Sequence, residues 1–508
     1  MFDQTLILLL AIPLVAIIAI IAGGPARNLA LLASVGNFGL AFVAAIVWSR
    51  TQDPDLGAFS IQVLSKPQIH LALGLPDGMS VVMMLLATLV TIPAVLAGKC
   101  PEGKENLWYI SILLISLGAV GAFLSTDLFF FYAFHELALI PTFLMIGMLG
   151  KGDRKTAAWQ VTIYLALGSI ILLAGLVGLV AATDSSSLLF ADLLKGEIAP
   201  DKQVGIAALL IIGFGVLVSL FPFHSWAAPA YASAPTPITM LHAGVLKKFG
   251  LYGLLRVYPL VPEGLQHWLV ALVVLLLGNI LWVGMVTINQ RRLDNLLANS
   301  SVMHMGYIFL AIAALAAGQG ENNIALPAAV VLMFAHGVSI ALLFLLSDRI
   351  ERLTGNLRLN ELGGLAKTAP TLAFLFGIAG MASIGLPGLA NFAGEVAVFL
   401  SGFENWTPDQ PLGAVQIGTI IAIFGVVLSA IYMLRAIRKI FQGETVPATE
   451  SAQDASWRDE APAILLAAAL LIVGLFPNLL FGLMDDKSEP VTPAPTSSRT
   501  TVSLSSPK

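Results

Sequence analysis

Fourteen apolar segments, each about 20 residues long, run along this chain of 508 residues and are separated by short polar loops. The hydrocarbon core of a bilayer is about 30 Å thick, and a helix of about 20 apolar residues spans it. The sequence therefore predicts an all-α polytopic membrane protein with about 14 transmembrane helices. The predicted spans cover residues 5–22, 28–48, 79–97, 107–124, 128–149, 157–181, 204–221, 236–257, 268–288, 302–317, 326–346, 369–402, 414–434 and 461–480.

The composition agrees with this prediction and excludes several classes of protein. Hydrophobic side chains make up 57% of the chain and charged ones 11%, whereas a soluble domain carries about 25% charged residues. The net charge of −4 leaves no basic patch for nucleic acid. Cys100 is the single cysteine, and no CxxC motif or Cys/His cluster is present to hold a metal or an iron–sulfur cluster. We therefore expect no cofactor in this chain and no nucleic-acid partner.

The distribution of Lys and Arg predicts the orientation. An even number of spans places both termini on one side of the membrane. If the termini lie outside, sixteen of the 26 Lys and Arg residues fall in cytoplasmic loops and eight fall outside, as the positive-inside rule requires. We expect both termini outside the bacterial inner membrane, with a first helix that is retained because no basic stretch precedes it. The Ser/Thr/Pro-rich residues 485–508 are expected to be a disordered external tail.

Two spans contain helix-breaking residues. The seventh runs into Phe221–Pro222, and the twelfth contains Gly385-Leu386-Pro387-Gly388. A pair of broken helices five spans apart predicts two five-helix repeats in opposite orientation, although ordinary proline kinks would also explain them. The predicted organisation comprises N-terminal helices 1–3 (1–106), a first repeat (107–260), a second repeat (261–440), a last loop and helix (441–484) and the tail (485–508).

Ionisable side chains inside the predicted spans are the candidates for function, because a charge near mid-membrane costs about 2.5 to 3.5 kcal/mol. The candidates are Glu136, Lys248, His304, His336 and Glu395. The two glutamates and Lys248 favour an ion path, while the histidines fit a packing role equally well. Lys247 lies about 100° around the helix from Lys248 and faces either the interior or a lipid interface. Proton transfer through water along a chain of Glu, Lys and His is the chemistry that these residues share.

Several motifs together resemble a known family. They are Leu75–Ser80 (LPDGMS), Phe134–Pro141 (FHELALIP), Pro222–Trp226 (PFHSW), Ala243–Lys248 (AGVLKK), Ser301–Gly306 (SVMHMG), and Gly385–Gly388 (GLPG) with Asn391–Glu395 (NFAGE). From about Leu71 to Gln442 the chain resembles the M-type antiporter-like subunit of respiratory complex I, the proton-pumping NADH:quinone oxidoreductase, which is related to Mrp-type cation/proton antiporter subunits. The glutamate at position 395 favours the M type, because the similar L and N types place a lysine there.

The resemblance implies roles for the five candidates. Glu136 would belong to the lysine/glutamate pair of the first half, Lys248 would be the connecting lysine, His304 and His336 would form the central polar axis, and Glu395 would be the exit-side site. It also implies a proton-translocating subunit of an enzyme that reduces quinone elsewhere, with no redox centre in this chain. The implied partners are other membrane-arm subunits of a multi-subunit complex, lipid, and protons, with Na+ as the alternative ion.

Three residues depart from the family pattern. Leu217 stands where the family has the lysine that pairs with the glutamate, His135 replaces a tryptophan, and Asp294 lies in Arg291–Asn295 where the family has Asp-x-Lys-Arg. The loss of the lysine favours a second hypothesis, a non-pumping structural paralogue. A subunit of a membrane hydrogenase or of a cation/proton antiporter complex is a third. A self-contained membrane enzyme is a fourth, although the sequence shows no acidic catalytic loop for it.

Overall fold

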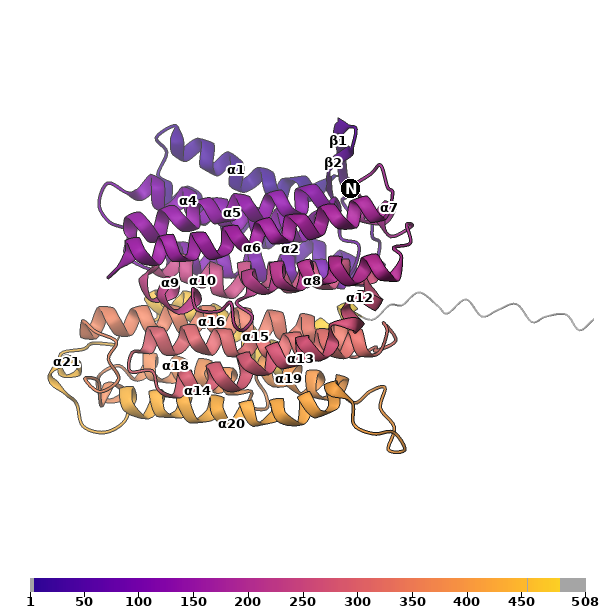
Figure 1. Ribbon diagram of the computed structural model, residues 1–508. Helices are drawn as coiled ribbons and strands as arrows, with labels where there is room; N and C mark the ends of the chain where they lie inside the picture. The colour runs from indigo at the N-terminus through magenta and orange to yellow at the C-terminus, as the bar shows by residue number, and fades with distance from the viewer. Residues whose placement is uncertain (1–3, 455, 485–508) are drawn as a thin grey trace, which may run out of the picture.

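A computed structural model describes residues 4–454 and 456–484 and shows a bundle of long helices that run side by side (Figure 1). Within these residues, ten helices are long and apolar enough to cross a membrane, or eleven if the bent pair Asp459–Leu475 and Asn478–Met484 is one span. The chain is thus a mostly helical polytopic membrane protein. The count of fourteen spans is not confirmed, because several predicted spans form shorter or interrupted helices.

The first part of the chain forms most of one side of the bundle. Its helices are η1 Thr5–Ile7, α1 Leu8–Ile21, α2 Ala26–Thr51, α3 Gly78–Leu96, α4 Glu105–Leu124, α5 Leu128–Leu149, α6 Arg154–Ala182, α7 Phe190–Leu193 and α8 Pro200–Val218. A middle stretch then links the two sides. It contains α9 Ala227–Ser233, α10 Thr236–Leu241, the π-helical η2 His242–Leu246, α11 Lys247–Val257, η3 Tyr258–Leu260 and α12 Pro262–His267.

Most of the remaining helices form the other side (Figure 1), whereas the last two, α22 Trp457–Leu475 and α23 Asn478–Met484, pack against α3 of the first part. The helices of the other side are α13 Leu269–Leu277, the π-helical η4 Gly278–Val283, α14 Gly284–Ile288, α15 Leu293–Ala317, α16 Ala325–Thr354, α17 Leu365–Thr368, α18 Pro370–Ile384, α19 Ala390–Ser401, α20 Ala414–Phe441 and α21 Pro447–Glu450. Helix α16 packs against α3, α10, α15, α18, α19 and α22, so it lies at the centre of the bundle.

Burial separates the central helices from those that expose apolar faces. Helices α15 and α16 are buried almost along their whole length. In contrast, α6 exposes Ile163, Leu167 and Ile170, which recur at helical spacing, and α20 exposes Phe424 and Val427. Such apolar stripes would be unfavourable in water, and they are the expected surface of a helix in a bilayer. A polar side chain on α15 or α16 is therefore enclosed by protein.

The all-α expectation is wrong for residues 59–73. Strands β1 Phe59–Ser65 and β2 Gln68–Leu73 form an antiparallel hairpin. The β1 segment alternates apolar and polar residues, a pattern typical of a strand, and it is too short to span a membrane as a helix. The backbone N–H of His70 donates to Asp127 Oδ2 at 2.9 Å. The same carboxylate caps the N-terminus of α5, so it attaches the hairpin to that helix.

Both predicted helix breaks are present. Helix α8 ends at Val218, and Ser219 follows with a left-handed φ of 69°. Helix α18 ends at Ile384, and Gly385 follows with φ 81°. The sequence did not indicate the two π-helical turns, η2 and η4. Each π turn shifts the side chains that follow it around the helix axis, because a π turn takes up an extra residue.

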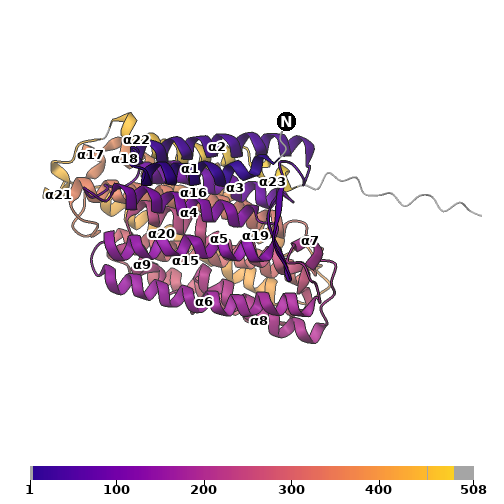
Figure 2. The ribbon, with the colours of Figure 1, turned by 90° about the horizontal axis from the view of Figure 1, so that it is seen from above.

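The described chain begins and ends at the same end of the bundle (Figure 2). Helix α23 lies against the start of α3 so closely that a Cβ on Gly78 would come within 1.8 Å of the Leu483 carbonyl oxygen. This arrangement requires an even number of crossings between the two ends. The tail 485–508 lies outside the described residues.

Candidate functional site

Lys248 and His336 form the first polar contact inside the bundle. Lys248 Nζ on α11 lies 2.9 Å from His336 Nδ1 on α16 and donates to the Ala243 carbonyl oxygen at 2.7 Å. Both side chains are buried. The contact follows directly after the π turn η2, which also supplies the Ala243 carbonyl. The two positions are 88 residues apart in the sequence, and the packing on α16 of η2, which directly precedes Lys247, brings them together.

His304 on α15 lies next to His336 and extends the row of buried polar side chains that begins at Lys248. The two imidazole ring centroids are 5.6 Å apart. His304 Nδ1 lies 2.7 Å from the Ser300 carbonyl oxygen, and Nε2 lies 2.9 Å from the Ser383 carbonyl oxygen at the end of α18. Carbonyl oxygens only accept hydrogen bonds, so His304 satisfies both contacts at once only when both ring nitrogens carry a proton.

Glu395 on α19 ends the line. Its Oε1 lies 3.9 Å from His304 Nε2, and its side chain is 5% exposed. Among the described residues, Oε1 has no hydrogen-bond partner. A Cβ on Gly385 would lie 2.1 Å from Glu395 Oε2, so the carboxylate occupies space that exists only because a glycine stands at the break between α18 and α19. The structure therefore brings four of the five predicted residues into one buried line.

Glu136, the fifth predicted residue, lies apart from this line. It is on α5 and accepts a hydrogen bond from the Ser169 hydroxyl of α6. His135 Nδ1 is 3.7 Å from Glu136 Oε1, and the Glu136 side chain is 37% exposed. No Lys or Arg of the described residues forms an ion pair with it. Leu217 is buried in α8, so the sequence departure corresponds to a real absence of the expected cation.

Lys247 is buried, and its predicted alternative of reaching a lipid interface is wrong. Its Nζ donates to Ser301 Oγ of α15 at 3.4 Å. The ammonium also lies 5.2 Å from the Tyr231 ring centroid and 5.9 Å from that of Trp226. Tyr231 of α9 and Ser301 of α15 thus enclose this face of α11. The two consecutive lysines thus lie in two different polar environments, both inside the protein.

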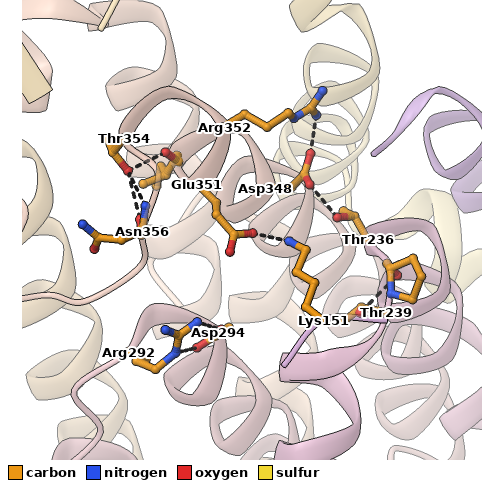
Figure 3. Close-up of polar contacts among 12 residues, drawn as sticks. Lys151, Thr236, Thr239, Arg292, Asp294, Asp348, Glu351, Arg352, Thr354 and Asn356 are labelled. Carbon is orange, nitrogen blue, oxygen red and sulfur yellow. Dashed lines mark hydrogen bonds and ion pairs between the residues drawn. The ribbon is translucent and has the colours of Figure 1, made fainter. Parts of the chain in front are cut away.

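A cluster of charged residues lies where the start of α10 faces the last turns of α16 (Figure 3). Lys151 pairs with Glu351, and Asp348 accepts hydrogen bonds from Arg352 and from Thr236. A cavity of about 30 Å3 lies among these groups and is lined by Tyr231 as well. Asp294, one of the departures from the family pattern, also lines it and pairs with Arg292 at 2.6 Å.

Sequence reasoning missed several polar groups of the site. Asn279 on η4 accepts a hydrogen bond from the Phe221 N–H at 2.6 Å and donates to the Ser219 and Val302 carbonyl oxygens, so it satisfies backbone groups freed by the break after α8. The buried Tyr307 hydroxyl has no partner among the described residues. An uncharged polar side chain within an apolar span was the available signal for both. Across the described ranges, no three His, Cys, Asp or Glu side chains are grouped so that they could hold a metal ion.

Comparisons with known proteins agree with this geometry. The family model for NADH:quinone oxidoreductase and Mrp antiporter transmembrane subunits matches residues 125–437. The chain is 33% identical over 437 residues to the NAD(P)H-quinone oxidoreductase chain 4 1 of Synechococcus sp. (strain JA-3-3Ab), covering 84% of this chain and 81% of that protein. A similar protein of Microcystis aeruginosa, chain 4 2, is 30% identical over 482 residues, covering 89% of this chain and 86% of that protein.

Solved structures show the same fold. A chain of respiratory complex I from Thermus thermophilus superimposes with a TM-score of 0.83 at 27% identity, covering 94% of this chain and 98% of that one. A chain of the Mrp complex from Dietzia sp. DQ12-45-1b gives a TM-score of 0.79 at 23% identity, covering 95% of this chain and 96% of that one. At that identity the Mrp match shows the fold alone. The chain belongs to the NADH:quinone oxidoreductase/Mrp antiporter family of transmembrane subunits.

Proposed function

We propose that this chain is a proton-translocating membrane-arm subunit of an NADH:quinone oxidoreductase of the chain 4, or M, type. The observation that carries the proposal is the buried line of Lys248, His336, His304 and Glu395, which four different helices assemble in the interior of a membrane-spanning bundle. The relatives named NAD(P)H-quinone oxidoreductase chain 4 support the assignment to this type. Quinone reduction would take place in other subunits.

The geometry supports stepwise proton transfer along the line. A proton on Lys248 passes to His336 across the 2.9 Å contact, which leaves a neutral amine and a charged imidazole. His304, which carries a proton on both ring nitrogens in this arrangement, first gives its Nε2 proton to Glu395, whose Oε1 has no hydrogen-bond partner in the described structure, and then accepts the proton from His336. Each transfer neutralises its donor. Since an unpaired buried charge is costly, Glu395 carries its charge most easily while His304 is protonated.

We further propose the topology that the sequence predicts. Both termini would lie outside the bacterial inner membrane, with two inverted five-helix repeats at 107–260 and 261–440, preceded by the helices of 1–106 and followed by the loop and helix of 441–484. The breaks after α8 and α18 support the repeats, because each helix ends in a residue of positive φ. The common end of the described chain supports an even number of spans. Lipid and other membrane-arm subunits would cover the apolar faces of α6 and α20.

Replacement of Glu395 by glutamine tests the proposed function. The complex carrying Glu395→Gln should assemble and oxidise NADH, but proton uptake in reconstituted vesicles should fall to background, because the amide keeps the shape and cannot titrate. Glu321→Gln is the matched control, since Glu321 is exposed in the loop before α16. Wild-type proton uptake by Glu395→Gln would show that Glu395 is a packing residue and would refute the proposed line.

Leu217, which stands where the family has a lysine, favours a second candidate function: a structural paralogue that does not pump protons. In that case neither the native complex nor its variants would show proton flux that depends on this chain. Assemblies such as a cation/proton antiporter share the fold, and neighbouring genes distinguish them: genes for quinone-reducing and iron–sulfur subunits accompany a complex I chain. A flux that requires Na+ and resists protonophores would indicate Na+ as the ion.

A further inference from the structure

Lys247 is an enclosed cation that the line from Lys248 to Glu395 does not use. Its residue is 1% exposed. Within the described ranges it forms no ion pair, and its contacts are the Ser301 hydroxyl and the faces of Tyr231 and Trp226. Ring faces and one hydroxyl compensate a buried ammonium only in part. A buried ammonium without a counter-ion is therefore costly for a side chain that only packs.

One side of Lys247 lies near Leu217, the position where the family has a lysine. The Trp226 indole N–H donates to the Val216 carbonyl oxygen at 3.1 Å, and Val216 is the neighbour of Leu217 in the last turn of α8. The Lys247 ammonium lies over this same indole ring, 5.9 Å from its centroid. It therefore places a cation beside the end of α8 from another helix.

The other side of Lys247 faces Tyr231, which borders the charged cluster of Lys151, Asp348 and Glu351. Tyr231 lies between them: its ring faces the ammonium, and its residue also lines the cavity among Lys151, Asp348 and Glu351. The Tyr231 hydroxyl and His242 Nδ1 are 3.0 Å apart. A cavity of about 30 Å3 with polar walls is large enough for a water molecule. An aqueous surface is thus connected to Lys247 through one aromatic residue that can exchange protons.

We propose that Lys247 replaces the lysine lost at position 217 and takes up protons from the cavity lined by Tyr231, Asp348 and Glu351. This inference rests on the proposed function. A protonated water in the cavity gives its extra proton through the Tyr231–His242 pair to the neutral Lys247 amine; the amine becomes an ammonium, and a neutral water remains in the cavity. The ammonium releases one proton through Ser301 Oγ toward His304, one helical turn further along α15, and returns to the neutral amine. The first-half site at Glu136 is not needed for this route.

The test measures protons per electron in reconstituted complexes that carry variants of this chain. Lys247→Leu should lower the ratio about tenfold or more, as expected for the loss of a positioned proton carrier, while assembly and NADH oxidation persist. Lys202→Leu, which removes an exposed lysine from α8, should leave the ratio unchanged. In the double variant Leu217→Lys/Lys247→Leu, the cation returns to the family position and the ratio should recover in part. A wild-type ratio for Lys247→Leu would overturn the proposal.

Tyr231→Phe tests the uptake route without changing the lysine. It keeps the proposal testable if the complex with Lys247→Leu fails to assemble. It preserves the ring over the ammonium and removes the hydroxyl next to His242. The ratio should fall severalfold, and no change would refute uptake through Tyr231. Glu395→Gln, measured in the same vesicles, separates the two proposals. If Glu395→Gln abolishes flux and Lys247→Leu does not, only the present inference fails; if neither affects flux, the proposed function fails.

Discussion

The acidic sites at Glu395 and Glu136 differ in almost every physical respect. Glu395 is 5% exposed, lies 3.9 Å from a histidine, and rests against a glycine at a helix break. Glu136 is 37% exposed, and its closest cationic candidate is the adjacent His135. One half of the molecule thus keeps its carboxylate in a closed polar line, whereas the other has lost the cation that enclosed it. Under the proposed function, proton movement would depend on the second half, and Lys247 would supply the uptake.

Of the variants that test this comparison, Gly385→Ala should reduce proton flux the most. A Cβ at this position would lie 2.1 Å from Glu395 Oε2, and its φ of 81° disfavours any side chain; such a conformation costs about 1–3 kcal/mol in a non-glycine residue. We expect proton flux to fall about tenfold or more. Gly377→Ala on the same helix meets nothing within 4 Å and should pump normally. Equal flux in the two variants would show that the position of Glu395 is unimportant.

Glu136→Gln should have a much smaller effect, which sharpens the comparison. The amide still reaches the Ser169 hydroxyl, and no lysine of the described chain loses a partner. Proton uptake in vesicles should fall about twofold to threefold at most, while Glu395→Gln should abolish it. A complete loss in Glu136→Gln would mean that the first half still carries the flux despite Leu217.

Asp77→Asn should reduce stability and leave the proton-to-electron ratio unchanged. Asp77 caps α3 and pairs with Arg256 of α11 at 2.6 Å and 3.1 Å. The variant removes the negative charge beside this guanidinium, which keeps its contacts with Ser80 and Tyr252, at a cost of about 1–3 kcal/mol. The thermal midpoint of the purified complex measures this loss. A changed ratio at normal stability would place this pair in the proton path instead.

The pH dependence of that stability provides a second check. Burial by itself would raise the pKa of Asp77, but the charge and hydrogen bonds of Arg256, with those of Ser80, outweigh burial and hold the pKa below its usual 3.8. A carboxyl with a depressed pKa stabilises the folded protein above its unfolded value and ceases to do so as the pH falls through the folded value. The native complex should therefore lose stability below about pH 4 more steeply than Asp77→Asn. Parallel acid-side curves would contradict the assignment.

Cysteine labelling should determine the orientation of the chain in the membrane, and the labelled variants should keep the proton flux of the native complex. In a Cys100→Ser background, a cysteine at Lys155 should react with a membrane-impermeant maleimide only in inverted vesicles, and a cysteine at Glu197 only in intact cells. Both positions are exposed. The opposite pattern would place the Tyr231 cavity outside. Native Cys100 is itself a weak target, since burial and nearby Glu105 raise the pKa of its thiol to about 11 and leave little reactive thiolate at neutral pH.

The sequence predicted much of this molecule correctly. Hydropathy located the long apolar helices, although the count of fourteen spans is not confirmed, and the Pro/Gly clusters located the breaks after α8 and α18. The charged residues within apolar spans included all four members of the buried line. These features are readable because each depends on one segment at a time: lipid requires apolar length, proline removes a donor, and a buried charge stands out against its neighbours.

The tertiary structure decided what depends on several segments at once. The hairpin at 59–73 escaped a search for apolar length. The π turn η2 and the packing of α9 and α15 enclosed Lys247, while packing on α6 left Glu136 apart from the line. A side chain's direction depends on the accumulated rotation of its helix, and one extra residue in a turn changes it by about 100°. The sequence alone therefore determined which residues are placed in the membrane, and the fold determined which of them meet.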